Sequence, residues 1–72
     1  MKSYFCYIHL AGSLTPELRT IAAPDDERLP EMIARDLPEW PPMERIERIE
    51  VCTMENQLMF SITPREALAY YH

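Results

Sequence analysis

The sequence predicts a small α+β domain in which one helix packs on a four-stranded antiparallel sheet. Residues 3–10 are rich in aromatic and β-branched residues, and apolar residues recur at every second position in both arms of residues 48–63, which is typical of strands. Between them Leu29, Ile33 and Leu37 recur at intervals of four, the spacing of one buried helix face. The predicted order is strand, strand, helix, strand, strand (β-β-α-β-β) and a short C-terminal helical turn, in one domain over residues 1–72.

Size and composition predict self-association. A chain of 72 residues buries only about 60% of its unfolded surface when it folds alone. Hydrophobic residues make up 47% of the sequence, with five Met, four Tyr and one Trp. A monomer of this size cannot comfortably cover that much apolar surface, so we expect a homodimer.

The charge pattern argues against several classes of partner. The sequence has twelve acidic and seven basic residues, for a net charge of −5. The basic residues are scattered, which disfavours nucleic-acid binding. No apolar run approaches the ~20 residues of a membrane span, and the first residues lack a signal peptide's apolar core. Cys6 and Cys52 have no disulfide-framework spacing. The expectation is a reduced, cytoplasmic protein.

Residues 3–10 form the first predicted strand, and both of its faces carry bulky side chains. One face holds Tyr4, Cys6, Ile8 and Leu10, and the other holds Phe5, Tyr7 and His9. Bulk on both faces predicts a helix on one side and a partner on the other. Phe5, Tyr7 and His9 are therefore candidate interface residues. Gly12, the only glycine, marks the turn that follows.

Residues 14–24 admit two interpretations. Thr15 and Pro16 resemble an N-cap and a first helical position, which would start a helix through residue 23. The alternative is a second strand over residues 19–23, paired with the first as a hairpin. The strand is favoured because the segment is short, ends at Pro24 and contains β-branched Thr20 and Ile21.

The helix is predicted from residue 25 to residue 37. Met32 lies beside the apolar stripe, and Asp25 or Asp26 can cap the N-terminus. Pro30 fits best near the start, so the regular helix is expected to begin there. Pro38 is expected to end it by pushing Leu37 out of helical geometry.

Residues 38–42 are predicted to form a stiff, extended, proline-rich connector. Trp40 has two interpretations within it. It presents a rigid recognition surface to a partner, or it folds back and covers the end of the helix–sheet core. The second interpretation is favoured, and Trp40 is kept as a candidate interface residue.

Residues 48–63 predict a β-hairpin whose register follows from its apolar residues. Ile49, Val51 and Thr53 alternate on one arm, and Leu58, Phe60 and Ile62 alternate on the other. A two-residue loop at Glu55 and Asn56 puts all six on one face by pairing residues 53 with 58, 51 with 60 and 49 with 62. A four-residue loop over 54–57 keeps this register, whereas a three-residue loop moves one arm's apolar set to the wrong face. Two residues are favoured because Asn tolerates the left-handed backbone of a type I′ turn.

The other hairpin face holds Glu50, Cys52, Met59 and Ser61, so Cys52 and Met59 are further candidate interface residues. Ile46 is out of phase with Ile49, which predicts a bulge or a strand that begins near Arg48. After the hairpin, Thr63, Pro64 and Glu66 have the spacing of a capping box and predict a short helical turn.

Three segments of the chain resemble an uncharacterised family of short, mostly alphaproteobacterial proteins, a domain of unknown function. They are YFCYIHLAGSLTPE, IEVCTMENQLMFSI and PREAL. Asn56 departs from the family's hairpin glycine, Thr20 from a glycine before its second strand, and Pro30 from its Ala-rich helix. The resemblance implies the same fold and a bacterial origin, and it carries over no catalytic, cofactor or metal-binding residues.

The residues themselves predict no catalytic set. Cys6 and His9 lie three apart on a strand, so their side chains point to opposite faces and cannot act together. Two His and two Cys without ligand spacing argue against a zinc site. A single Gly leaves no loop to hold a phosphate or a nucleotide cofactor.

The function expected from the sequence is a non-enzymatic protein–protein interaction module that acts as a homodimer and binds an unknown protein. The alternative is a small acidic inhibitor, phage- or defence-related, that occupies a basic or nucleic-acid-binding surface. The candidate interface residues are Phe5, Tyr7, His9, Trp40, Cys52 and Met59.

Overall fold

The computed structural model describes residues 1–71 and confirms the predicted fold class. Four strands form one sheet in the order β2-β1-β3-β4, with every neighbouring pair antiparallel. The strands are β1 (Lys2–Leu10), β2 (Glu17–Ala23), β3 (Ile46–Thr53) and β4 (Leu58–Ile62). The helices are α1 (Leu29–Asp36) and α2 (Pro64–Leu68), with 3₁₀ turns at Asp26–Arg28, Leu37–Glu39 and Met43–Arg45.

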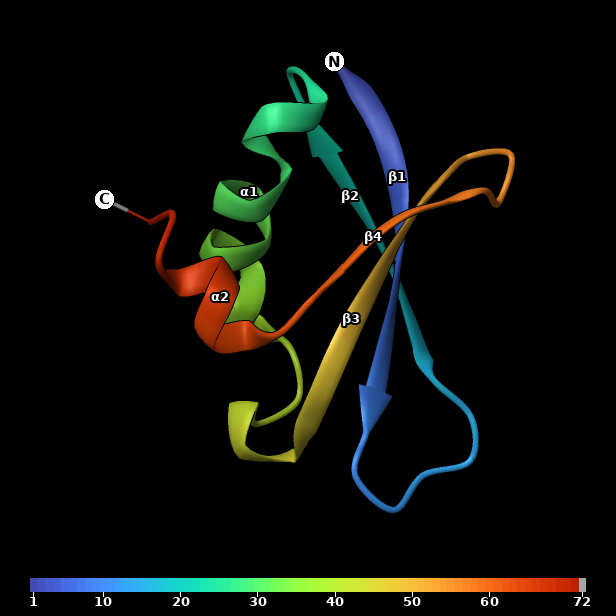
Figure 1. Cartoon of the computed structure of the whole chain (residues 1–72), viewed down its shortest axis with the longest axis vertical. Helices are drawn as coiled ribbons and strands as arrows, with labels where there is room; N and C mark the ends of the chain where they lie inside the picture. The colour runs from blue at the N-terminus through green and yellow to red at the C-terminus, as the bar shows by residue number, and fades with distance from the viewer. Residues whose placement is uncertain (72) are drawn as a thin grey trace.

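The molecule has two layers. Both helices lie on the same side of the twisted sheet, with α2 beside α1 (Figure 1). We call the covered side, which carries Cys6 and Ile8 of β1, the inner face, and the opposite side, which carries Phe5 and Tyr7, the outer face. The extents of 33 × 30 × 18 Å leave room for one sheet and one helical layer. No other element of residues 1–71 covers the outer face.

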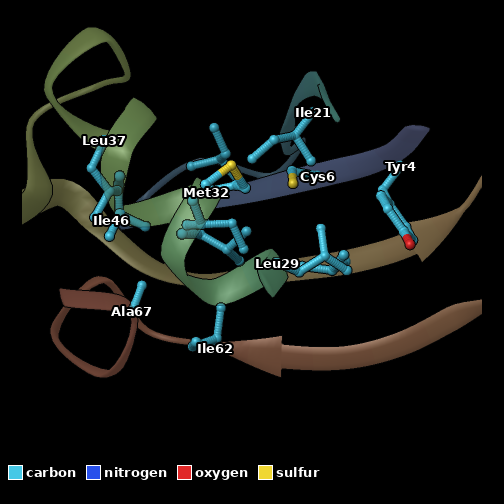
Figure 2. Close-up of a cluster of buried hydrophobic side chains, with 14 of the residues drawn as sticks. Tyr4, Cys6, Ile21, Leu29, Met32, Leu37, Ile46, Ile62 and Ala67 are labelled. Carbon is cyan, nitrogen blue, oxygen red and sulfur yellow. The ribbon is translucent and has the colours of Figure 1, made fainter. Parts of the chain in front are cut away.

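The hydrophobic core fills the space between the helices and the inner face. Figure 2 shows Leu29 within this cluster, Leu37 and Ile46 toward one end and Tyr4 at the other. The largest fully buried side chains are Cys6, Ile8, Leu29, Ile33, Ile49 and Val51. They come from α1 and from the two central strands, so the strongest burial lies where the helix crosses the middle of the sheet.

The second segment is a strand, as favoured from the sequence. β2 begins at Glu17, two residues before the predicted start, and pairs with β1 from Ile8↔Glu17 to Lys2↔Ala23. Ile21 and Ala23 are buried on the inner face, whereas Thr20 and Ala22, the residues that precede them, are exposed. This period of two is what a half-covered strand requires.

The helix forms as predicted at its start and along its buried face. Asp25 accepts a hydrogen bond from the Arg28 backbone N–H and caps a 3₁₀ turn, after which α1 begins with Pro30 in its first turn. Leu29, Ile33 and Leu37 are all buried, so the predicted stripe is confirmed.

The end of the helix differs from the prediction. Leu37 keeps helical dihedral angles (φ −49°, ψ −40°) and continues into a 3₁₀ turn through Pro38 and Glu39. The predicted extended connector is therefore wrong for its first residues. The Trp40 N–H donates to the Leu37 carbonyl at 3.0 Å. This turn keeps the Leu37 side chain in the core. Its burial outweighs the steric preference of a residue before proline for an extended backbone.

A bulge lies where β3 begins, as one of the two sequence interpretations predicted. The register between β1 and β3 shifts between His9 and Leu10, so that Leu10 pairs with Ile46. The extra residue turns Ile46 to the inner face, where it is buried.

The hairpin loop contradicts the favoured prediction. The Asn56 N–H donates to the Thr53 carbonyl at 2.8 Å, and the Thr53 N–H donates to the Gln57 carbonyl at 2.9 Å. These bonds close a three-residue loop, 54–56. Asn56 alone among the non-glycine residues described has a positive φ, 66°. Glu55 therefore lacks the left-handed backbone that a two-residue type I′ turn needs.

The three-residue loop shifts the register, and a bulge at Met59 restores it. Cys52 pairs with Leu58, instead of the predicted Thr53, while the predicted pairs Val51↔Phe60 and Ile49↔Ile62 are both present. The shift falls between Val51 and Cys52. One extra residue in the loop and one in the bulge compensate each other, so most of the apolar set stays on the inner face.

The C-terminal helical turn begins as predicted. The Glu66 N–H donates to Thr63 Oγ1 at 3.2 Å, and the Thr63 N–H donates to Glu66 Oε1 at 2.9 Å. This reciprocal pair is a capping box. It starts α2 so that Ala67 is fully buried against the core.

Candidate functional site

The outer face of the sheet is the candidate site, and strand pairing arranges it in two cross-strand rows. One row consists of Thr20, Phe5, Cys52 and Leu58, and the next consists of Leu18, Tyr7, Glu50 and Ser61. Each row draws one residue from every strand, so segments far apart in the sequence contribute side by side. This surface exists only because the two hairpins pair through β1 and β3.

Five residues of these rows form an apolar patch, which we call the outer patch: Phe5, Tyr7, Leu18, Cys52 and Leu58. Leu58 is 60% exposed and Leu18 49% exposed. Phe5 and Tyr7 are half-buried, with ring centroids 6.5 Å apart and planes tilted by 50°. Cys52 is only 6% exposed, because it lies between Phe5 and Leu58 in its row. The outer patch is thus a ridge of aromatic rings flanked by two exposed leucines.

Polar side chains hold the patch in place at its borders. The Tyr7 hydroxyl donates to Asn56 Oδ1 at 2.7 Å, which ties the hairpin loop to β1. His9 Nε2 contacts Glu50 Oε1, and both side chains are less than one-third exposed. His9 is thus a hydrogen-bonded residue beside the patch, as expected for a surface or interface histidine.

The outer face brings Cys52, Glu50 and His9 onto one surface, a grouping that the sequence analysis did not consider. Within residues 1–71 no hydrogen bond joins the thiol to the imidazole, and Glu50 is the partner of His9. Burial, and then the charge of Glu50, raise the pKa of the Cys52 thiol. A nucleophilic cysteine needs a lowered pKa, whereas burial and the charge of Glu50 shift the Cys52 pKa in the opposite direction.

Cys6 is likewise a buried thiol with a raised pKa. It is fully buried on the inner face, opposite to His9, as predicted from their spacing. Burial raises the pKa of its thiol to about 12, with smaller contributions from Asp36 and Cys52. Both cysteines are free thiols.

Two candidate interface residues lie away from the outer face. Trp40 packs half-buried against the core cluster, as the favoured interpretation had it, and lines a groove of about 460 Å³ beside Leu37 and Leu68. Met59 also packs against the core cluster, so its predicted place on the same face as Cys52 is wrong. The bulge turns it inward while Leu58 takes the outer position.

The structure adds Leu18, Leu58 and Asn56 to the outer face. The alternation of β2 could have indicated Leu18, because Thr20 and Ala22 share its face. Leu58 had no such signal, since its side depends on the bulge. Tyr4 is a further unforeseen polar contact: its hydroxyl donates to Asp26 Oδ1. This bond and burial raise the Tyr4 pKa to about 12.

In the part of the chain that the structure describes, no group of three or more His, Cys, Asp or Glu side chains could hold a metal ion. None of the described helices is both long and apolar enough to cross a membrane.

Comparisons with protein-family models, with curated proteins and with solved structures each returned no match. The resemblance to the alphaproteobacterial family therefore stays a prediction.

Proposed function

We propose that this chain is a non-enzymatic protein–protein interaction module that acts as a homodimer through the outer patch. The observation that supports the proposal most is that the helices cover only the inner face, while the outer face presents Phe5, Tyr7, Leu18 and Leu58. A sheet with one bare apolar face commonly packs it against a second protein surface.

The distribution of charge supports a second copy as the occupant. Seven of the twelve acidic residues lie between residues 25 and 45, and Glu66 is in α2, all in the segments of the helical layer. Glu50 is the one acidic residue of the two rows, and its carboxylate contacts His9. Two copies of an acidic chain therefore meet at the outer patch with little like-charge repulsion.

The patch also suits a symmetric contact. In a two-fold dimer the same surface of each copy forms the interface, so the patch must be complementary to itself. Tyr and Phe are enriched in interfaces because they bury a large area at a small entropic cost. The two free thiols agree with a reducing compartment, and we place the protein in the cytoplasm on that ground.

The oligomeric state in solution tests this proposal. Sedimentation equilibrium at micromolar concentration is expected to give twice the 8.5 kDa chain mass. Leu18→Arg and Leu58→Arg are each expected to shift the chain toward monomer, because both side chains lie in the outer patch and are exposed. The matched control is Leu14→Arg, the same change at a fully exposed position of the loop between β1 and β2.

Circular dichroism must show that all three variants keep the fold of the parent. A parent that stays monomeric at high concentration would overturn the homodimer. A dimer that all three variants leave intact would place the contact elsewhere and overturn the role of the outer patch.

The alternative, an acidic inhibitor of a basic or nucleic-acid-binding surface, would use the helical layer. Four arginines interrupt the acidic residues there: Arg28, Arg35, Arg45 and Arg65. Arg28 pairs with Glu31 at 2.7 Å and Arg35 with Asp36 at 3.1 Å. This mixed surface imitates nucleic-acid charge poorly, so the homodimer is preferred. Displacement of a DNA duplex from a basic DNA-binding protein by this chain would favour the alternative.

A further inference from the structure

The two edges of the sheet differ in how they are protected against pairing with another strand. β2 carries Glu17 and Arg19 and lies between Pro16 and Pro24, whereas β4, with the sequence LMFSI, has no charge and no proline. Natural proteins usually place charges, prolines or a covering element on an exposed edge. Among the residues described, β4 pairs only with β3. Its short length and its bulge are its only protection.

A groove runs beside β4 on the inner side, between this strand and residues 26–30 and 66 of the helical layer. It has a volume of about 520 Å³, and its apolar lining comes from Pro30, Phe60, Ile62 and the ring of Tyr70. Phe60 is only partly buried although it packs against the core cluster. A side chain from an added strand would therefore find both a free backbone edge and an apolar place to bind.

Three carboxylates border this groove: Asp26, Glu27 and Glu66. None of them forms an ion pair with any basic side chain in residues 1–71. Asp26 accepts from the neutral Tyr4 hydroxyl, and Glu66 accepts from the Thr63 backbone N–H. The border is thus negative and its charges are free to pair with a cation from outside.

We propose that β4 and this groove bind an extended segment of a partner protein by strand addition, with basic side chains beside an apolar one. Basic side chains would pair with the three carboxylates while the apolar side chain contacts Phe60. A second copy of this chain fits poorly, because its own acidic border would meet the same carboxylates. The proposal does not rest on the homodimer, because the groove lies on the inner side of β4, whereas the outer patch lies on the opposite face and takes only Leu58 from this strand.

A fluorescein-labelled peptide of alternating arginine and valine is the probe, and fluorescence anisotropy is the measurement. Saturable binding is expected, and a peptide with glutamate in place of arginine is expected not to bind. Glu27→Lys should weaken binding about tenfold. The matched control Glu39→Lys makes the same charge change at an exposed site of the helical layer that does not line the groove, and should alter binding less than about twofold.

Two more arms test strand addition itself. A peptide N-methylated at alternate residues should lose binding, because it cannot complete the backbone ladder. Hydrogen exchange should slow at β4 amides and not at β2 amides when the unmodified peptide is bound. Leu18→Arg should bind the peptide as the parent does, so failure of the homodimer and failure of this proposal are separable.

The absence of saturable binding would overturn the proposal. So would equal weakening by Glu27→Lys and Glu39→Lys, which would indicate attraction by net charge alone. In the Leu18→Arg variant, which is expected not to dimerise through the outer patch, protection of β4 amides that grows with protein concentration in the absence of peptide would identify a second copy as the occupant and overturn the proposal as well.

Discussion

Asn56 shows how one residue determines the shape of a loop and of the surface beside it. Its φ of 66° lies in the left-handed region, which Asn tolerates better than most residues. Its side-chain Oδ1 accepts a hydrogen bond from the Tyr7 hydroxyl at 2.7 Å. The same residue therefore closes the three-residue loop and anchors that loop to the outer patch.

Substitutions at Asn56 separate these two roles. Asn56→Val should destabilise the fold by about 1–3 kcal/mol, because a β-branched residue is strained at positive φ. Asn56→Gly relieves the backbone and loses the bond to Tyr7, so the net change should stay within about 1 kcal/mol. Thermal or urea unfolding measures both, and Tyr7→Phe is the control for the hydrogen bond alone. Equal losses for Val and Gly would show that backbone conformation is not what position 56 contributes.

At the scale of elements, α1 holds the fold together through one face. Leu29, Ile33 and Leu37 are at most 2% exposed, and all three belong to the core cluster between the helices and the inner face. Leu37 lies toward one end of this cluster (Figure 2). The two 3₁₀ turns on either side of α1 keep the ends of this stripe in the core. Helix, turns and sheet therefore depend on the same few side chains.

Ile33→Ala should cost about 2–5 kcal/mol, since it leaves a cavity in a fully packed site. A loss of this size threatens a fold as small as this one. Arg35→Ala should stay within about 0.5 kcal/mol, because Arg35 is exposed and its ion pair with Asp36 lies at the surface. Urea unfolding of both variants is the measurement. Comparable losses would mean that α1 presents a different face to the sheet.

At the scale of the whole molecule, buried ionisable groups couple stability to pH. A hydrogen bond to Asp26, together with burial, raises the Tyr4 pKa from 10.0 to about 12. Burial raises the Cys6 pKa from 9.0 to about 12. The unfolded chain releases these protons at 9.0 and 10.0, while the folded chain keeps them until about 12. Their contribution to stability is therefore complete below pH 9 and is lost as the pH rises toward 12.

The urea concentration at the unfolding midpoint should accordingly decrease as the pH rises from 9 to 12. Tyr4→Phe should make the part of this fall above pH 10 shallower, because Phe has no proton to release. Tyr70→Phe is the matched control, since Tyr70 is 53% exposed. If both variants retained the parent's full pH dependence, the Tyr4 hydroxyl would have no part in it.

On the scale of the whole molecule, the two proposed contacts also lie on different parts of the surface. The outer patch covers a face of the sheet, whereas the groove beside β4 lies at its edge, between the strand and the helical layer. Acidic residues border the groove, and none belongs to the outer patch. We therefore propose an identical chain as the partner of one surface and a basic segment as the partner of the other, and we expect each contact to form without the other.

Local patterns in the sequence were enough to predict most elements. The alternation in β1, the four-residue spacing in α1 and the Thr63 capping box each depend on neighbours within one element, so they could be predicted before any packing was known. The same reasoning predicted Phe5, Tyr7 and His9 on one face and Cys6 opposite to them. The order of residues alone determines which side chains share a face, because side chains repeat with a fixed period in a helix and in a strand.

Tertiary structure decided the features in which two local preferences competed. The loop of the second hairpin and the bulge at Met59 each add one residue, and only their sum conserves the inner-face pairs Val51↔Phe60 and Ile49↔Ile62. Leu37 stays helical before Pro38 because its burial outweighs the local steric preference. The outer patch and the β4 groove depend on strand order and on where the helices stop. Those are properties of packing between distant segments, which no local period encodes.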